Sequence, residues 1–190
     1  MAATKKHAPA KKWLMEKKMF YVSTCRKPVQ STRVLAKWLA RLFGGFHENR
    51  GKRGVEDLLQ RASTRGFSRI LFVYERHGNP VELSVYDEEQ GWLSPGMKIK
   101  LLELPAGEQQ ASRRLPSKCN VVLGDEEAKK AGALFLHAVT FSEEQEEDAV
   151  SAFLQKNTLS FSYKGVAVGP VLKVELIEGN MDKIEENAEK

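Results

Sequence analysis

The sequence predicts an α/β or α+β domain made of two halves that repeat the same kinds of element. Strand-like stretches alternate with stretches of helical periodicity in both halves of the 190-residue chain, as expected for helices packed on a small mixed sheet. The halves differ in charge: residues 1–80 contain 18 Lys and Arg against 5 Asp and Glu, and residues 81–190 contain 12 against 20. A basic half attracts polyanions, so nucleic acid is the leading candidate partner, although a charged surface can also be simply solvated.

Three segments follow from the composition. We expect residues 1–18 to be a flexible basic arm, because their lysines are mixed with Ala and Pro rather than with periodic apolar residues. Residues 19–178 are expected to form the domain, with an N-terminal half of about 19–90 and a C-terminal half of about 96–178. Residues 179–190 form an acidic tail. With 42% hydrophobic residues, the chain can bury an ordinary globular core.

The N-terminal half begins with a strand at Met19–Ser23, which the turn at Arg26–Pro28 ends. A helix follows from about Thr32, with Ser31 or Thr32 as its N-cap and Gly44 and Gly45 at its end. Its apolar residues recur at helical spacing and are Val34, Leu35, Trp38, Leu39, Leu42 and Phe43.

A second helix is predicted from Val55 to about Arg65, with acidic residues in its first turn and Gly66 after its end. The apolar run Arg69–Arg76 predicts a strand buried on both faces, and His77–Pro80 is strong turn chemistry. Val81–Tyr86 then pairs with that strand as a hairpin.

The C-terminal half shows further strands and two helical stretches. Ser142 and Gln145 have capping-box spacing, which predicts a helix from about Ser142 to Gln155. Asp125–Ala138 is expected to start as a helix, but Ala133–Leu136 fits either a helix or a strand. The predicted strands are Ile99–Leu104, Asn120–Leu123, Leu159–Tyr163 and Val166–Ile177.

Basic residues gather in the turns of the N-terminal half and on its first helix. On the first helix, Arg33, Lys37 and Arg41 are each four residues from the next and form a cationic stripe on one helix face. Such a stripe can follow a phosphate backbone. Asn49–Gly54 contains Gly-x-x-Gly with two cations between the glycines; its amides could bind phosphate at the helix start, or the glycines could only permit the turn. Arg76 and Asn79 contact RNA if their turn lies near the others, and are otherwise structural. The candidate RNA-binding residues are Arg26, Lys27, Arg33, Lys37, Arg41, Asn49, Arg50, Lys52, Arg53, Arg76 and Asn79.

Three aromatic residues, Trp13, Phe46 and Trp92, could stack on unpaired bases or could be packing residues. Trp38 lies on the apolar helix face and is expected in the core.

No catalytic, cofactor or metal site is expected. Cys25 and Cys119 are far apart and lack a Cys-x-x-Cys pair, so neither a disulfide framework nor a zinc site is indicated. The segment Gly45–Lys52 does not match the phosphate-binding P-loop motif. Its glycines are one residue too far apart, and Arg53 stands where the motif has the Ser or Thr that holds magnesium. Cys25 beside Arg26 could have a lowered pKa, but no base accompanies it. The acidic run Glu143–Asp148 is more typical of solvated surface than of a cation site.

The chain has neither a signal peptide pattern nor an apolar stretch long enough to span a membrane. We therefore expect a cytoplasmic protein, or a nucleolar one if the source is eukaryotic.

Four motifs in order resemble the Brix domain of ribosome-biogenesis proteins, in the compact archaeal form similar to the Imp-four subfamily. They are Tyr21–Pro28 with Ser31–Arg33, Asn49–Lys52, Val55–Leu59 and Glu75–Pro80, and Val168–Leu172 is similar to the family's closing Gly-Pro motif. The resemblance covers about Met19 to Leu176. It implies two pseudo-symmetric halves, each similar to the anticodon-binding domain of some tRNA synthetases, and a non-enzymatic role in ribosomal RNA processing.

The leading hypothesis is a factor that binds small-subunit precursor rRNA or a guide RNA, with other ribosome-assembly proteins as further partners. An alternative is a protein adaptor whose basic half docks on acidic partners. The third, an enzyme that depends on Cys25 or on a nucleotide, has no motif to support it.

Overall fold

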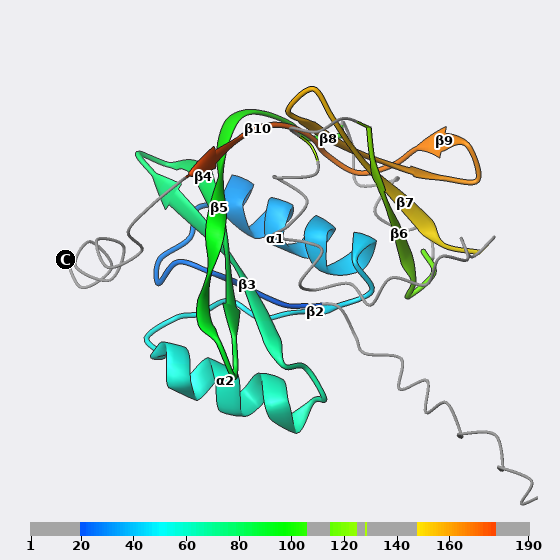
Figure 1. Cartoon of the computed structure of the whole chain (residues 1–190). Coiled ribbons are helices and arrows are strands. Elements are labelled where there is room, and N and C mark those ends of the chain that lie inside the picture. The colour runs from blue at the N-terminus through cyan, green and yellow to red at the C-terminus, as the bar shows by residue number, and fades with distance from the viewer. Residues whose placement is uncertain (1–19, 106–114, 125–127, 129–147, 178–190) are drawn as a thin grey trace, which may run out of the picture.

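The computed structural model describes residues 20–105, 115–124, 128 and 148–177, and shows two helices and a large mixed sheet (Figure 1). The helices are α1 (Gln30–Leu42) and α2 (Val55–Thr64). The strands are β1 (Tyr21–Thr24), β2 (Phe46–His47), β3 (Arg69–Arg76), β4 (Asn79–Asp87), β5 (Gly91–Glu103), β6 (Cys119–Leu123), β7 (Val150–Gln155), β8 (Thr158–Tyr163), β9 (Val166–Ala167) and β10 (Val171–Ile177).

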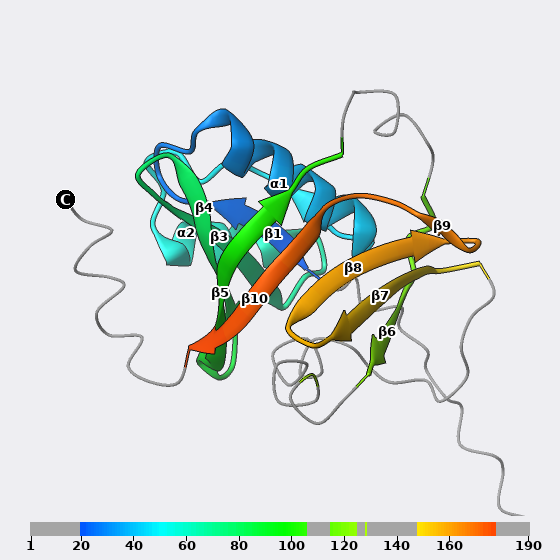
Figure 2. The same ribbon diagram turned by 90° about the horizontal axis from the view of Figure 1, so that it is seen from above.

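The strand order has the symmetry of two related units joined in one sheet. The order is β2-β1-β3-β4-β5-β10-β8-β7-β6, with β9 beside β8. From one end, β1 and β3 are parallel and β4 and β5 follow antiparallel; from the other, β6 and β7 are parallel and β8 and β10 follow antiparallel. The antiparallel pair β5 and β10 joins them (Figure 2). This arrangement places a pseudo-two-fold axis between β5 and β10 and confirms the mixed α/β class.

The two helices lie on opposite faces of the N-terminal part of the sheet. Phe20 and Val22 belong to the core that contains α1, whereas Tyr21 belongs to a second core with α2, as strand alternation requires. Figure 1 shows α1 between this part of the sheet and the strands of the second unit. Phe43, just after α1, meets Phe161 of β8 with ring centroids 5.5 Å apart. Helix α1 is therefore the element that both units bury.

The start of α1 differs from the prediction. Neither Ser31 nor Thr32 caps the helix; its N-cap is Val29, which has no side-chain cap. Instead, Glu75 Oε2 accepts hydrogen bonds from the Val29 N–H at 2.8 Å and from Thr32 Oγ1 at 2.7 Å. A carboxylate from β3 thus replaces the local cap. The predicted end is confirmed, because Gly44 follows with φ +62°.

The predicted helix to Gln155 is wrong over the described residues, because Val150–Gln155 is the strand β7. Its side chains alternate between buried and more exposed, with Ala152 and Leu154 buried and Phe153 exposed, and it pairs with β6 and β8. Strand pairing therefore prevails over the capping signal. The rest of that helix, and Asp125–Ala138 apart from Ala128, lie outside the described residues.

Other boundaries also shift. Strand β5 begins at Gly91, well before the predicted Ile99, and the predicted strand Val166–Ile177 is divided into β9 and β10. The division falls at Gly169, whose φ is +74°. Neither α1 nor α2 is long and apolar enough to cross a membrane, and the described residues include no other candidate.

Candidate nucleic-acid interface

Three basic turns lie together at the carboxyl ends of β1, β2 and β3. Strands β2 and β3 both run parallel to β1, so their carboxyl ends lie together. Hydrogen bonds tie the turns that follow: Cys25 N–H donates to Val73 O at 3.2 Å, and Arg50 N–H donates to Thr24 Oγ1 at 3.4 Å. Ligands of open α/β sheets bind outside such carboxyl ends. We call this surface the carboxyl edge, formed by Cys25–Pro28, Asn49–Gly54 and Arg76–Asn79.

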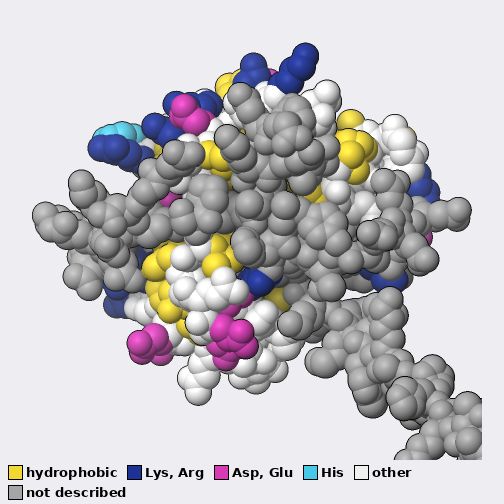
Figure 3. Space-filling model, in the orientation of Figure 1, with side chains coloured by type: hydrophobic (Ala, Val, Ile, Leu, Met, Phe, Trp, Pro, Cys, Tyr) yellow, Lys and Arg dark blue, Asp and Glu magenta, His cyan; other side chains and the backbone are white. Residues whose placement is uncertain are grey.

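The carboxyl edge carries exposed cations from all three turns. Arg26, Lys27, Lys52 and Arg76 are exposed, as are the amides Asn49 and Asn79. Figure 3 shows Lys and Arg side chains at the left of the view, where Figure 1 has the β3–β4 turn. The structure thus brings together the turns that the sequence singled out separately.

The β3–β4 turn owes its shape to two residues with positive φ, His77 at +51° and Gly78 at +78°. Two such residues are typical of a type I′ hairpin turn. Ser31 Oγ donates to Gly78 O at 3.5 Å, so the turn lies against the start of α1.

Glu48 fixes the second turn. Its carboxylate accepts from Tyr21 OH and from Arg61 Nε and Nη2 at 3.1 and 3.0 Å, and it pairs with Arg53 at 3.1 Å. Burial acts to raise the pKa of Glu48, but the hydrogen bonds from Arg61 and Tyr21 and the charge of Arg53 outweigh it and lower the pKa. Burial and the Glu48 hydrogen bond raise the pKa of Tyr21 to about 12. Glu48 therefore stays ionised at neutral pH and holds the loop to α2.

Arg50 differs from the other candidates because only 6% of it is exposed. Its Nε donates to Arg53 O at 2.9 Å, and its guanidinium carbon lies 5.7 Å from the centre of the Phe72 ring. Arg53 in turn donates to Asn49 O at 3.2 Å. We assign Arg50 to shaping the loop, whereas Asn49 and Lys52 are exposed.

The cationic stripe leads away from the carboxyl edge along α1. Arg33 and Lys37 are exposed, and Arg33 Nε donates to Pro28 O at 2.9 Å. Arg41 is partly exposed, with its guanidinium carbon 5.2 Å from the Trp38 ring centre. The stripe and the turns thus form one basic surface.

The chemistry of these groups suits anion binding rather than nucleophilic attack. The expectation of a lowered pKa for Cys25 is wrong: burial, and then the charge of Glu75, raise the pKa of its thiol to about 11. Within the described part of the chain, no cluster of three His, Cys, Asp or Glu residues could hold a metal ion.

Sequence reasoning missed Arg61 and Arg65 on and after α2. Arg61 binds Glu48, and the Arg65 guanidinium carbon lies 4.2 Å from the centre of the Phe46 ring. In the sequence, the only indication of these residues is that the two arginines are four positions apart at the end of the predicted helix. Of the aromatic candidates, Trp92 is a packing residue, since its ring meets Tyr86 at 5.1 Å and Phe72 at 5.3 Å, and Trp13 lies outside the described residues.

The pKa of Glu48 gives a pH-dependent prediction. Glu48→Gln should lower the thermal midpoint at pH 7, because the amide carries no charge for Arg53 and Arg61. A folded pKa below the unfolded value means that this stability is fully present above roughly pH 4.3 and is lost as pH falls through the folded pKa. The gap between wild type and variant, measured by thermal melts from pH 7 to 3, should therefore close at acid pH. The exposed Glu88→Gln is the control, and a gap independent of pH would contradict the prediction.

The fold and the carboxyl edge together define a pseudo-symmetric α/β protein with a basic surface on its first half. No family model matches the chain. A probable Brix domain-containing ribosomal biogenesis protein from Aeropyrum pernix is 30% identical over 172 residues, which cover 80% of this chain and 93% of that protein. Proteins of the same name from Methanothermobacter thermautotrophicus and Methanosarcina barkeri are 39% and 43% identical, over 54% and 41% of their lengths and 44% and 35% of this chain. The chain belongs to the family of Brix domain-containing ribosomal biogenesis proteins.

Solved structures agree with this assignment. The crystal structure of a probable ribosomal biogenesis protein from Aeropyrum pernix matches with a TM-score of 0.68 and 27% identity, over 84% of this chain and 97% of that one. The crystal structure of Mil, an archaeal Imp4-like protein, matches in fold with a TM-score of 0.61 and 24% identity, over 84% and 100%. The names of the curated relatives, and of the first of these structures, describe ribosomal biogenesis proteins.

Proposed function

We propose that this protein is a non-enzymatic RNA-binding factor in ribosome biogenesis that holds small-subunit precursor rRNA, or the pairing of that RNA with a guide RNA. The observation that carries the proposal is the meeting of three basic turns at the carboxyl ends of β1, β2 and β3. Their exposed cations can neutralise successive phosphates, while the amides of Asn49 and Asn79 can reach sugar or base edges. The names of the relatives support the choice of ribosomal RNA.

The surface suits RNA because its acidic groups hold the turns in place while most of its cations stay exposed. Glu48 and Glu75 lie beneath the turns, where they accept hydrogen bonds from the loop, α2 and the start of α1. The cations above them, Arg26, Lys27 and Lys52, are exposed. The acidic second half would repel RNA and face other assembly proteins, which orients the RNA on one side of the molecule.

Binding of a single-stranded precursor fragment should weaken with salt, and Arg33→Ala/Lys37→Ala/Arg41→Ala should flatten that dependence. The loss of three phosphate contacts should reduce the slope of log affinity against log salt by about 2. This change corresponds to about 50-fold weaker binding at physiological salt. Fluorescence anisotropy across a salt series measures the affinity and its dependence on salt. Lys98→Ala/Lys156→Ala/Lys173→Ala removes equal charge from β5, the β7–β8 turn and β10 and should leave the slope unchanged. Equal slopes for wild type and the α1 variant, together with displacement by an acidic protein, would favour the adaptor instead.

A further inference from the structure

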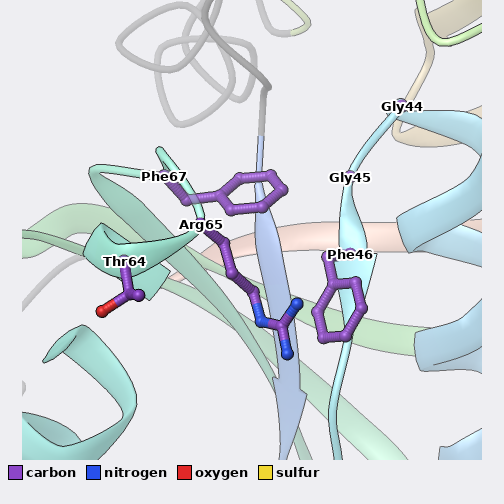
Figure 4. Close-up of a pocket in the computed structure, with 6 residues that line it drawn as sticks. All are labelled: Gly44, Gly45, Phe46, Thr64, Arg65 and Phe67. Carbon is purple, nitrogen blue, oxygen red and sulfur yellow. The ribbon is translucent and has the colours of Figure 1, made fainter. Parts of the chain in front are cut away.

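A cavity of about 450 Å³ opens beside the edge strand β2, outside the carboxyl edge. It is lined by Gly44, Gly45, Phe46, Thr64, Arg65 and Phe67 (Figure 4). Its volume is within the range of about 300–1,000 Å³ that is usual for small-molecule sites. Residues from the ends of both helices and from β2 surround it, so it belongs to the folded scaffold rather than to one loop.

The cavity combines flat aromatic rings with a guanidinium. Figure 4 shows the Arg65 guanidinium beside the Phe46 ring, with Phe67 above it in the view. Phe46 is 36% exposed, although an aromatic ring gains most from burial. Tyr21 lies 5.5 Å from Phe46 and 5.9 Å from Phe67 between ring centroids and is fully buried. This backing holds the wall rigid, which lowers the cost of ordering it around a ligand.

The cavity is reached along a basic path. Phe46 precedes Asn49 by three residues, so the cavity lies about 10 Å from the carboxyl edge. Cations from both helices flank β2 between the two sites: Lys37 acts electrostatically on His47, and Arg61 binds Glu48. A strand of RNA on the carboxyl edge can therefore continue past β2 beside the exposed Lys37.

We propose that this cavity takes one unpaired nucleobase of the bound RNA, stacked on the Arg65–Phe46 pair. Single-stranded RNA is read by bases stacked on aromatic rings and on Arg guanidinium planes, and both surfaces are present here. Gly44 and Gly45, which follow α1, also line the cavity and carry no side chain that would fill it. The inference rests on the proposed RNA binding and adds a base subsite to it.

The test compares Phe46→Leu with wild type on a 12-nucleotide single-stranded RNA across a salt series. Loss of one stacked base should weaken binding about 5- to 150-fold and leave the salt slope unchanged, since no phosphate contact is lost. Arg65→Lys, which keeps the charge but not the flat guanidinium, should weaken binding several-fold. Phe153→Leu on β7 is the matched control, because Phe153 is 39% exposed and lies in the other half.

An abasic oligonucleotide of the same length separates stacking from loss of structure. Wild type and Phe46→Leu should bind it equally, because the backbone contacts are common to both. If wild type binds the RNA with a steep salt slope but Phe46→Leu and Arg65→Lys bind as tightly, the base subsite is wrong and RNA binding stands. A wild type without salt-dependent RNA binding would overturn both. A lower affinity of Phe46→Leu on the abasic strand as well would overturn the subsite in favour of a structural role.

Discussion

Removing the four exposed cations of the carboxyl edge should weaken RNA binding about 200-fold at physiological salt. The variant is Arg26→Ala/Lys27→Ala/Lys52→Ala/Arg76→Ala, which takes residues from all three turns. Each phosphate contact to a single strand steepens the dependence of log affinity on log salt by about 0.7, so four contacts give a slope change of about 2.8. Between 1 M and physiological salt, a slope change of about 2.8 corresponds to the loss of about 200-fold in affinity.

The control for this variant removes the same charge elsewhere. Lys98→Ala/Lys156→Ala/Lys164→Ala/Lys173→Ala changes four exposed residues of β5 and the second half. A long-range field acts through net charge and would affect both variants alike, whereas contacts at the carboxyl edge affect only the first. Anisotropy titrations at four or more salt concentrations measure the slopes. Equal losses in the two variants would show that the carboxyl edge is not the binding surface.

The thermal midpoint of the edge variant should stay near that of wild type. The interactions that hold the turns in place come from Glu48, Glu75, Arg50 and Arg53, none of which is changed. Surface substitutions away from such interactions usually alter stability by no more than about 0.5 kcal/mol. A large drop would show that binding was lost through unfolding.

The turns and α1 could be predicted because their signals are local. The spacing from Val34 to Phe43 sets the buried face of α1, and His77-Gly78 fixes a tight hairpin whatever surrounds it. The order of the parallel strands then brings the turns together. This meeting depends on long-range pairing, which the sequence of each turn does not contain.

The predictions that were wrong concern features set by contacts between residues far apart in the sequence. Glu75 lies 46 residues from Val29, so no local pattern reveals that it replaces the N-cap of α1. Val150–Gln155 contains helix-compatible residues, but its neighbours β6 and β8 select a strand. Arg50 belongs to a basic run, and only the packing of Phe72 beneath the loop shows that it is buried.

Arg65 shows the same limit at the cavity. In the sequence it is one cation near the end of a helix, typical of a favourable interaction with the helix dipole. Its contact with Phe46, 19 residues earlier in the chain, arises because the turn after α2 lies beside the edge strand β2. Fold-level information was therefore needed to recognise the cavity and to propose a base subsite there.

Gly169→Ala should destabilise the protein strongly, by about 2–5 kcal/mol, while Gly165→Ala should cost only about 1–2 kcal/mol. Both glycines have nearly the same positive φ, +74° and +75°, so the backbone penalty for a Cβ is common to the two. A Cβ at Gly169 would lie 2.8 Å from Leu42 Cδ1, whereas nothing lies within 4 Å of one at Gly165. The difference between the two variants therefore isolates the contact with α1.

Leu42 is fully buried at the end of α1, so it cannot move aside without disturbing the core that joins the two halves. Chemical denaturation measures the free energy of unfolding for the two glycine variants, for Leu42→Ala and for the double variant Gly169→Ala/Leu42→Ala. The double variant should lose less stability than the sum of its single changes, because the space left by Leu42 receives the new methyl group. Equal destabilisation by the two glycine variants, or strict additivity in the double variant, would mean that Gly169 does not serve to admit α1. The closing Gly-Pro motif would then only form the turn before β10, and the two halves would be held together by β5 and β10 without it.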